Sequence, residues 1–133
     1  MYSKVMHISD EEFSKMIDEA FKSLPEKYTH AMQNVAIVYE DDPSEAQRQK
    51  MHLQDNQTLF GLYEGIPLPQ RGAGYNLVLP DKITLFKNPI MHVSKDFIDL
   101  QKQIRHTLWH EIAHHFGLDH DHIYRLDGTD KSE

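Results

Sequence analysis

The sequence predicts one α+β domain, and three observations support this fold class. The chain has 133 residues, 39% of them apolar and 26% charged, a length and composition that suit a single domain with its own core. Apolar residues recur at helical spacing near both ends of the chain. Short runs rich in β-branched residues lie between these two segments. We therefore expect residues 1–133 to form one domain with helices near its ends and strands between them.

The first predicted helix covers residues 10–24. Ser9 and Glu12 form the capping-box pattern, in which each side chain satisfies a backbone N–H of the other residue. Apolar residues then recur every three or four positions, and Pro25 closes the segment. The following apolar run, residues 34–40, is predicted to be a buried strand.

The middle of the chain is rich in polar and turn-forming residues. Residues 40–57 are almost entirely polar, which predicts a loop or a mobile excursion within the domain. Residues 59–69 alternate apolar side chains with Gly and Pro, so we expect a packed but irregular segment. Residues 75–79 and 82–86 read as two short strands, which we expect to form a hairpin at a sheet edge.

A second helical pattern occupies residues 94–116. Apolar residues from Phe97 and Ile98 onward recur on or near one face, and Gly117 is placed to end the helix as a left-handed cap. The spacing is compatible with one long helix or with two shorter ones. Residues 127–133 are polar and are predicted to be a frayed tail.

Composition excludes several classes of function. The absence of cysteine rules out disulfides, thiolate metal sites and a cysteine nucleophile, and it suits a reducing cytoplasm, where we expect the protein to be. A net charge of −7 argues against a phosphate-binding surface, so no nucleic-acid partner is expected. No run approaches the ~20 apolar residues that a membrane span needs. The ten histidines are unusual, because imidazole is the commonest metal ligand.

The pattern that carries chemistry lies at the end of the second predicted helix. His110 and His114 are four residues apart, so they share one helix face and can bind one tetrahedral ion. Glu111 lies beside that ion, where its carboxylate can accept a proton from bound water. Gly117 lets the chain leave the helix so that His120 can return as a third ligand. Three protein ligands leave a fourth position for water, as in catalytic zinc sites.

The full pattern is improbable by composition alone. H-E-x-x-H arises by chance in about one such chain in twenty, and adding the Gly and third His reduces this to roughly two in ten thousand. Asp119 and Asp121 are candidates to orient the ligands through hydrogen bonds. By contrast, we interpret His106 as solvated, and His115 and His122 as surface residues.

Two further positions can serve either chemistry or structure, and a third belongs to the core. Arg71 and Tyr124 are candidates to stabilise an oxyanion, although a structural role is favoured for each. Trp109, like its apolar neighbours on the helix, is predicted to belong to the core.

The segment from His110 to Asp121 resembles the extended H-E-x-x-H-x-x-G-x-x-H motif of the metzincin peptidases, with an acid after the third His as in adamalysin-like enzymes. Over residues 8–122 the chain resembles more closely the minimal zincins, a bacterial family of small cysteine-free proteins. That resemblance also rests on the stretch Gly61–Leu68. It implies a zincin-like fold, in which a small mixed sheet packs against the N-terminal helix and the C-terminal active-site helix, with an edge strand beside the latter.

One feature of metzincins has no counterpart in the sequence. Those enzymes place a Met-turn beneath the metal, downstream of the third His. Only 13 residues follow His120, none of them Met, and all six methionines lie at or before Met91. The floor of the site must therefore be built from other residues.

The leading interpretation is a monomeric zinc-dependent peptidase. Its Zn²⁺ would be bound by His110, His114 and His120, and Glu111 would act as general base on a peptide or protein substrate. We expect the extended substrate to add to the sheet along residues 82–86.

Two other classes of function remain open. A family of three-His endoribonucleases has a similar H-x-x-x-H-x-x-G-x-D-H pattern, but with Gly in place of Glu111, and a nuclease should also show a basic channel. The third interpretation is a zinc-binding regulatory module with little catalysis.

Overall fold

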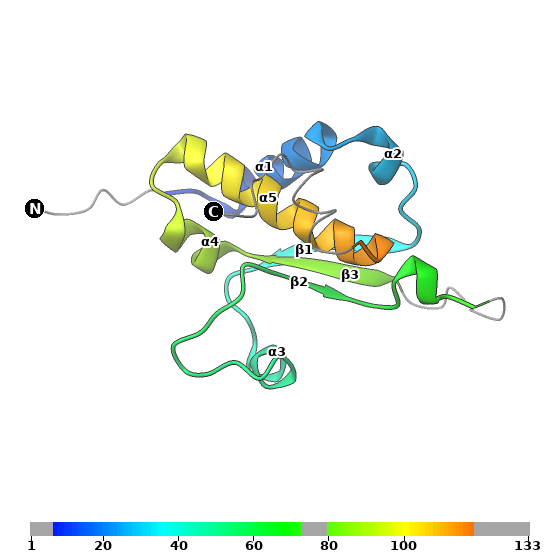
Figure 1. Ribbon diagram of the computed structural model, residues 1–133. Helices are drawn as coiled ribbons and strands as arrows, with labels where there is room; N and C mark the ends of the chain where they lie inside the picture. The colour runs from blue at the N-terminus through cyan, green and yellow to red at the C-terminus, as the bar shows by residue number, and fades with distance from the viewer. Residues whose placement is uncertain (1–6, 73–79, 119–133) are drawn as a thin grey trace, which may run out of the picture.

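The computed structural model describes residues 7–72 and 80–118. Its elements in chain order are α1 (Asp10–Ser23), α2 (Glu26–Thr29), β1 (Val35–Glu40), α3 (Glu45–Lys50), β2 (Gly61–Glu64), the 3-10 turn η1 (Leu68–Gln70), β3 (Asp81–Phe86), α4 (Lys87–Val93) and α5 (Phe97–Phe116). Figure 1 shows α1 and α5 on one side of a three-stranded sheet and α3 on the other. The predicted α+β class, a small mixed sheet packed against an N-terminal and a C-terminal helix, is confirmed.

Helix α1 begins where the capping pattern places it. The Ser9 Oγ accepts a hydrogen bond from the Glu12 N–H at 3.0 Å, and the Glu12 carboxylate accepts one from the Ser9 N–H at 3.1 Å. The helix ends at Ser23, because Leu24 adopts an extended conformation before Pro25. The predicted helix over residues 10–24 is therefore confirmed to within one residue.

The sheet is mixed, with strand order β1-β3-β2. β1 pairs with β3 in parallel, and β2 pairs with β3 in antiparallel orientation. The prediction that residues 82–86 form a sheet edge is wrong, because β3 is hydrogen bonded on both sides. The third strand is β2, which lies inside the segment predicted to be irregular. The other strand of the predicted hairpin, residues 75–79, lies outside the described residues.

The predicted loop at 40–57 contains a helix. Ser44 and Gln47 form a second capping box, and α3 follows for six residues. The Lys50 Nζ lies 3.3 Å from the Glu64 carboxylate of β2, and the Gln47 side chain is buried. The loop interpretation missed α3 because the segment lacks an apolar face, although its cap was visible in the sequence.

Helix α5 is a single helix of 20 residues, which settles the choice between one helix and two. Its N-cap is Asp96, whose Oδ1 accepts a hydrogen bond from the Asp99 N–H at 2.8 Å. Gly117 ends the helix with φ of 71°, as predicted. Phe97 and Ile98 were expected on the apolar face, but they are 48% and 65% exposed, because the first turn lies outside the core.

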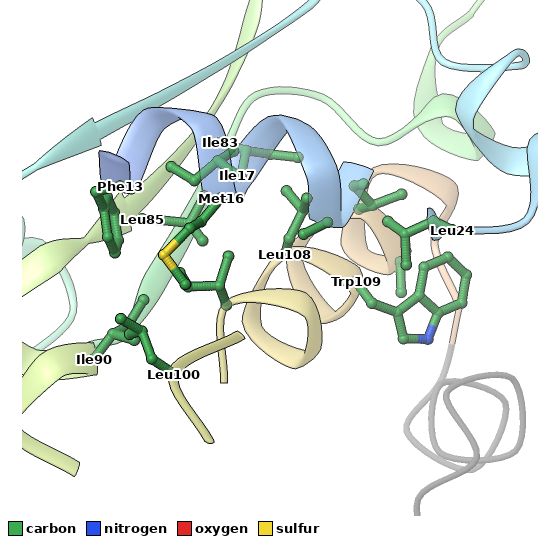
Figure 2. Packing of buried hydrophobic residues seen from close by; sticks show 14 residues of the cluster. Phe13, Met16, Ile17, Leu24, Ile83, Leu85, Ile90, Leu100, Leu108 and Trp109 are labelled. Carbon is green, nitrogen blue, oxygen red and sulfur yellow. The ribbon is translucent and has the colours of Figure 1, made fainter. Parts of the chain in front are cut away.

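The core fills the space between α1, α5 and one face of the sheet. Figure 2 shows side chains of α1, β3, α4 and α5 interdigitating there, with the Trp109 ring at one end. The labelled residues are Phe13, Met16, Ile17, Leu24, Ile83, Leu85, Ile90, Leu100, Leu108 and Trp109. Trp109, Leu108 and Ile112 are buried, as predicted for core residues. Among the described residues, no helix is both long enough and apolar enough to cross a membrane.

Candidate metal centre on helix α5

The last two turns of α5 bring three potential metal ligands together. The rings of His110 and His114 lie with centroids 4.8 Å apart and planes at 65°. One ligand atom from each of His110, Glu111 and His114 falls within 4.8 Å of the others. The two histidines are partly exposed, so an ion can reach them, whereas Glu111 is only 7% exposed. Imidazole nitrogens with an adjacent carboxylate form a donor set that suits Zn²⁺ and other first-row divalent ions.

Glu111 also holds one of the two histidines in place. Its Oε1 lies 3.3 Å from the Nδ1 of His114. The hydrogen bond to Glu111 raises the pKa of His114, and burial of the ring opposes that shift. An imidazole that donates its Nδ1–H to a carboxylate is oriented to bind a metal through Nε2.

Strand β2 approaches α5 closely at Gly61. A Cβ atom at this position would lie 2.8 Å from the Thr107 Cγ2 and 3.2 Å from the Glu111 Cγ, so only a glycine fits without a shift. Two residues of a strand advance about 6.8 Å, and four residues of a helix advance about 6.0 Å. Residues two apart on β2 can therefore face residues four apart on α5. Accordingly, Gly61 faces Glu111, and Tyr63 faces His115.

His115 is buried, which corrects its interpretation as a surface residue. Its ring is fully enclosed. The Nε2 accepts a hydrogen bond from the backbone N–H of Gln33 at 3.4 Å. The Nδ1 lies 3.3 Å from the Tyr63 hydroxyl and 3.4 Å from the Asp81 Oδ2. Burial lowers the pKa of His115, and the nearby Arg71 charge lowers it further, so the ring is neutral at pH 7.

Arg71 has the structural role that was favoured for it. Its Nη2 lies 2.5 Å from the Asp81 Oδ2, and the two side chains are only 7% and 3% exposed. Its Nε donates to the Ile66 carbonyl at 2.8 Å. We refer to Tyr63, Arg71, Asp81 and His115 together as the Asp81 cluster.

The Asp81 carboxylate is the centre of that cluster. Burial alone would raise the pKa of Asp81, but hydrogen bonds from the Tyr63 hydroxyl, the Ile66 N–H and Arg71 outweigh it, and the pKa lies below its usual value. For Tyr63, burial and then the bond to Asp81 raise the pKa of the phenol. The carboxylate is therefore charged and the phenol neutral at pH 7.

The other histidines and polar residues of the motif region lie partly outside the described residues. Those outside the described residues are His120, Asp119, Asp121, His122 and Tyr124. His106, one turn before His110, is partly buried. At the end of α5, Gly117 packs against Pro69 of η1, where a Cβ would lie 2.8 Å from the proline Cγ.

The sequence did not single out Tyr63 or Asp81, the two residues that contact His115. Tyr63 lies within the Gly61–Leu68 stretch that carried the family resemblance, but no spacing rule connects it to His115. One local signal was available, because His115 follows Glu111 by four residues and so shares its inward face.

Comparisons with known proteins agree with this fold. A model of the zincin-like metallopeptidase family matches residues 32–129, which is most of the chain. The chain therefore belongs to the zincin-like metallopeptidase family, which implies a metal ion, typically zinc. A solved structure of a conserved hypothetical protein from Thermus thermophilus is similar in fold, with a TM-score of 0.55 and 20% identity over 82% of this chain and 94% of that chain. No curated protein sequence matches significantly.

Proposed function

We propose that the protein is a zinc-dependent peptidase in which Glu111 is the general base. The observation that carries this proposal is the position of Glu111, a nearly buried carboxylate between the paired histidines and strand β2. The metal ligands would be His110 and His114, with His120 as the third. Membership in the metallopeptidase family supports the reaction class.

Zinc, when bound, polarises the scissile carbonyl and lowers the pKa of its water. Glu111 accepts the proton of the attacking water and passes it to the leaving amine. His114 is held in the binding orientation by Glu111 itself, through the 3.3 Å contact at its Nδ1. The Glu111 carboxylate would therefore both orient His114 and transfer the proton.

The substrate in this proposal is an extended peptide that pairs with β2. The sequence placed it along residues 82–86, but β3 is already paired on both sides. Among the described residues, β2 is an edge strand and lies directly beside α5. Its outer N–H and C=O groups can add a peptide strand to the sheet, as in other β-augmentation complexes.

The decisive test is Glu111→Gln in the zinc-loaded protein. The amide keeps the size of the carboxylate but cannot accept the proton, so cleavage of a broad peptide library should fall by about 10²–10⁴-fold while zinc stays bound. Glu19→Gln makes the same change on an exposed part of α1 and should retain full activity. Zinc content is measured by elemental analysis, and His114→Ala should lower it.

Each outcome of that test has a distinct meaning. Undiminished cleavage by Glu111→Gln would remove Glu111 as the base. Cleavage of single-stranded RNA without peptide cleavage would favour the endoribonuclease. A wild-type protein that binds zinc but cleaves neither substrate would favour the regulatory module.

A further inference from the structure

We propose that Tyr63 and His115, two members of the buried Asp81 cluster, are positioning residues of the metal centre. The cluster would fix the last turns of α5 against the sheet, and with them His114 and Glu111. This inference rests on the proposed function only in that α5 binds a metal, and its test does not require peptide cleavage.

The hydrogen bonds of the cluster form one directed chain. A backbone N–H can only donate, so the Nε2 of His115 must be the acceptor for Gln33. The proton of the neutral ring is therefore on Nδ1, which points to the Tyr63 oxygen and to Asp81. Tyr63 in turn donates to Asp81. Each ring nitrogen of His115 thus has a fixed role, and the ring has one orientation.

Asp81 joins this chain to the rest of the sheet. Its Oδ2 accepts from Arg71 and Tyr63, and its Oδ1 accepts from the Ile66 N–H at 3.3 Å. Gly65 packs so closely on this carboxylate that no side chain fits there. The cluster therefore ties together the end of β2, the start of β3 and the segments around Gln33 and Arg71.

The metal-binding turn lies directly beside this cluster. His115 follows His114 in the helix and lies one turn after Glu111. Gly61 sets the distance between β2 and α5 at Glu111, and Tyr63 sets it one turn later at His115. A helix turn moves as a rigid unit, so a shift of His115 away from Tyr63 would also move His114 and Glu111. Outer partners that orient a metal site commonly change its affinity by 10–100-fold.

Tyr63→Phe tests the inference by removing one oxygen atom. The phenylalanine ring keeps the edge-to-face contact with His115, whose ring centroid lies 5.9 Å away. We expect a folded protein whose zinc affinity is lower by about tenfold. Affinity is measured by competition with a chromogenic chelator. The visible spectrum of the Co²⁺-loaded protein, which reports ligand geometry, should change as well.

Tyr39→Phe is the matched control. Tyr39 is a partly buried tyrosine on β1, and its ring packs edge-on against Phe13, 5.6 Å away. Removing the Tyr39 hydroxyl should leave the zinc affinity and the cobalt spectrum unchanged. If Tyr63→Phe fails to fold, His115→Asn serves instead: its amide keeps a donor near the Nδ1 position but loses the Nε2 acceptor for the Gln33 N–H, and zinc affinity should again fall.

The outcomes separate this inference from the proposed function. A lower melting temperature for Tyr63→Phe with wild-type zinc affinity and cobalt spectrum would make the cluster purely structural and overturn the inference. A wild-type protein that binds zinc without cleaving peptides would overturn the proposed function alone. A wild-type protein that binds no divalent metal would overturn both.

Discussion

At Gly61 the edge strand β2 packs closely against α5. Gly61 has no side chain, and a Cβ at this position would meet the Thr107 methyl and the Glu111 side chain. The Thr84 carbonyl closes the third side, 3.3 Å from where a Cβ would lie. The position of Glu111 relative to β2 therefore depends on this glycine.

Gly61→Ala should lower peptide cleavage while zinc stays bound. The added methyl must displace either β2 or Glu111, and a displacement of about 1 Å can reduce turnover by about 100-fold. Gly72→Ala is the matched control, because a Cβ at Gly72 meets no atom within 4 Å. Steady-state kinetics and zinc analysis on both variants check the prediction. Equal activity in the two variants would show that the close approach at Gly61 has no role in catalysis.

At the scale of single residues, the sequence predicted the placements that depend only on spacing along a helix. Four-residue spacing placed His110 and His114 on one face, and the structure confirms that they lie together with Glu111. His115 was misassigned because its partners come from β2 and β3, far away in the chain. Only the tertiary fold brings Tyr63 and Asp81 to it.

At the scale of elements, α5 depends on a defined start as well as on its buried face. Asp96 precedes the helix in an extended conformation, and its carboxylate accepts a hydrogen bond from the Asp99 N–H. A carboxylate at this position also interacts favourably with the positive end of the helix dipole. The first turn has few apolar contacts to replace this cap, since Phe97 and Ile98 are exposed.

Asp96→Ala should lower the free energy of unfolding by about 1 kcal/mol, the usual effect of losing a helix N-cap. Urea unfolding of the metal-free protein measures it. Asp18→Ala removes an aspartate from an exposed position inside α1 and should change stability by less than about 0.5 kcal/mol. Similar losses in the two variants would argue that charge, and not capping, is responsible.

The Asp81 cluster makes stability depend on pH. The pKa of Asp81 is lower in the folded protein than the value of about 3.9 in an unfolded chain. Its stabilising contribution is therefore complete above about pH 4 and is lost as the pH falls through the folded-state pKa. Within residues 7–72 and 80–118, the ionisable groups that contact Asp81 are Tyr63, Arg71 and His115.

Asp81→Asn should thus be less stable than the wild type at pH 7 and less sensitive to acid. Urea unfolding of both proteins at pH 7 and pH 3, with chelator present, gives the comparison. The wild type should lose more unfolding free energy between these two pH values than the variant does. An equal loss would show that other carboxylates determine the acid response.

Elements were predictable where their signals are local. α1 followed from its capping box and apolar spacing, and the end of α5 followed from Gly117. β2 was missed because four residues between turn-forming neighbours carry little periodicity. The order β1-β3-β2 could not be read from the sequence, since pairing between distant strands has no local signature.

At the scale of the whole molecule, the core and the candidate metal centre use different faces of α5. Leu100, Ile104 and Leu108 point into the core, toward α1 and the sheet. His110 and His114 are partly exposed and do not belong to that cluster. The core is therefore built without the metal, in contrast to small domains that unfold when their structural zinc is removed.

Chelation should consequently leave the fold intact. The metal-free protein is expected to keep its far-UV circular dichroism and to melt in one cooperative transition. A metal that binds only the folded state still stabilises it by mass action, by about 2.7 kcal/mol at a free concentration 100 times its dissociation constant. The melting temperature should therefore rise progressively as Zn²⁺ is added back, and His114→Ala should show a smaller rise. Loss of the helical signal on chelation would mean that the zinc is structural. The proposal of an open catalytic site on α5 would then be wrong.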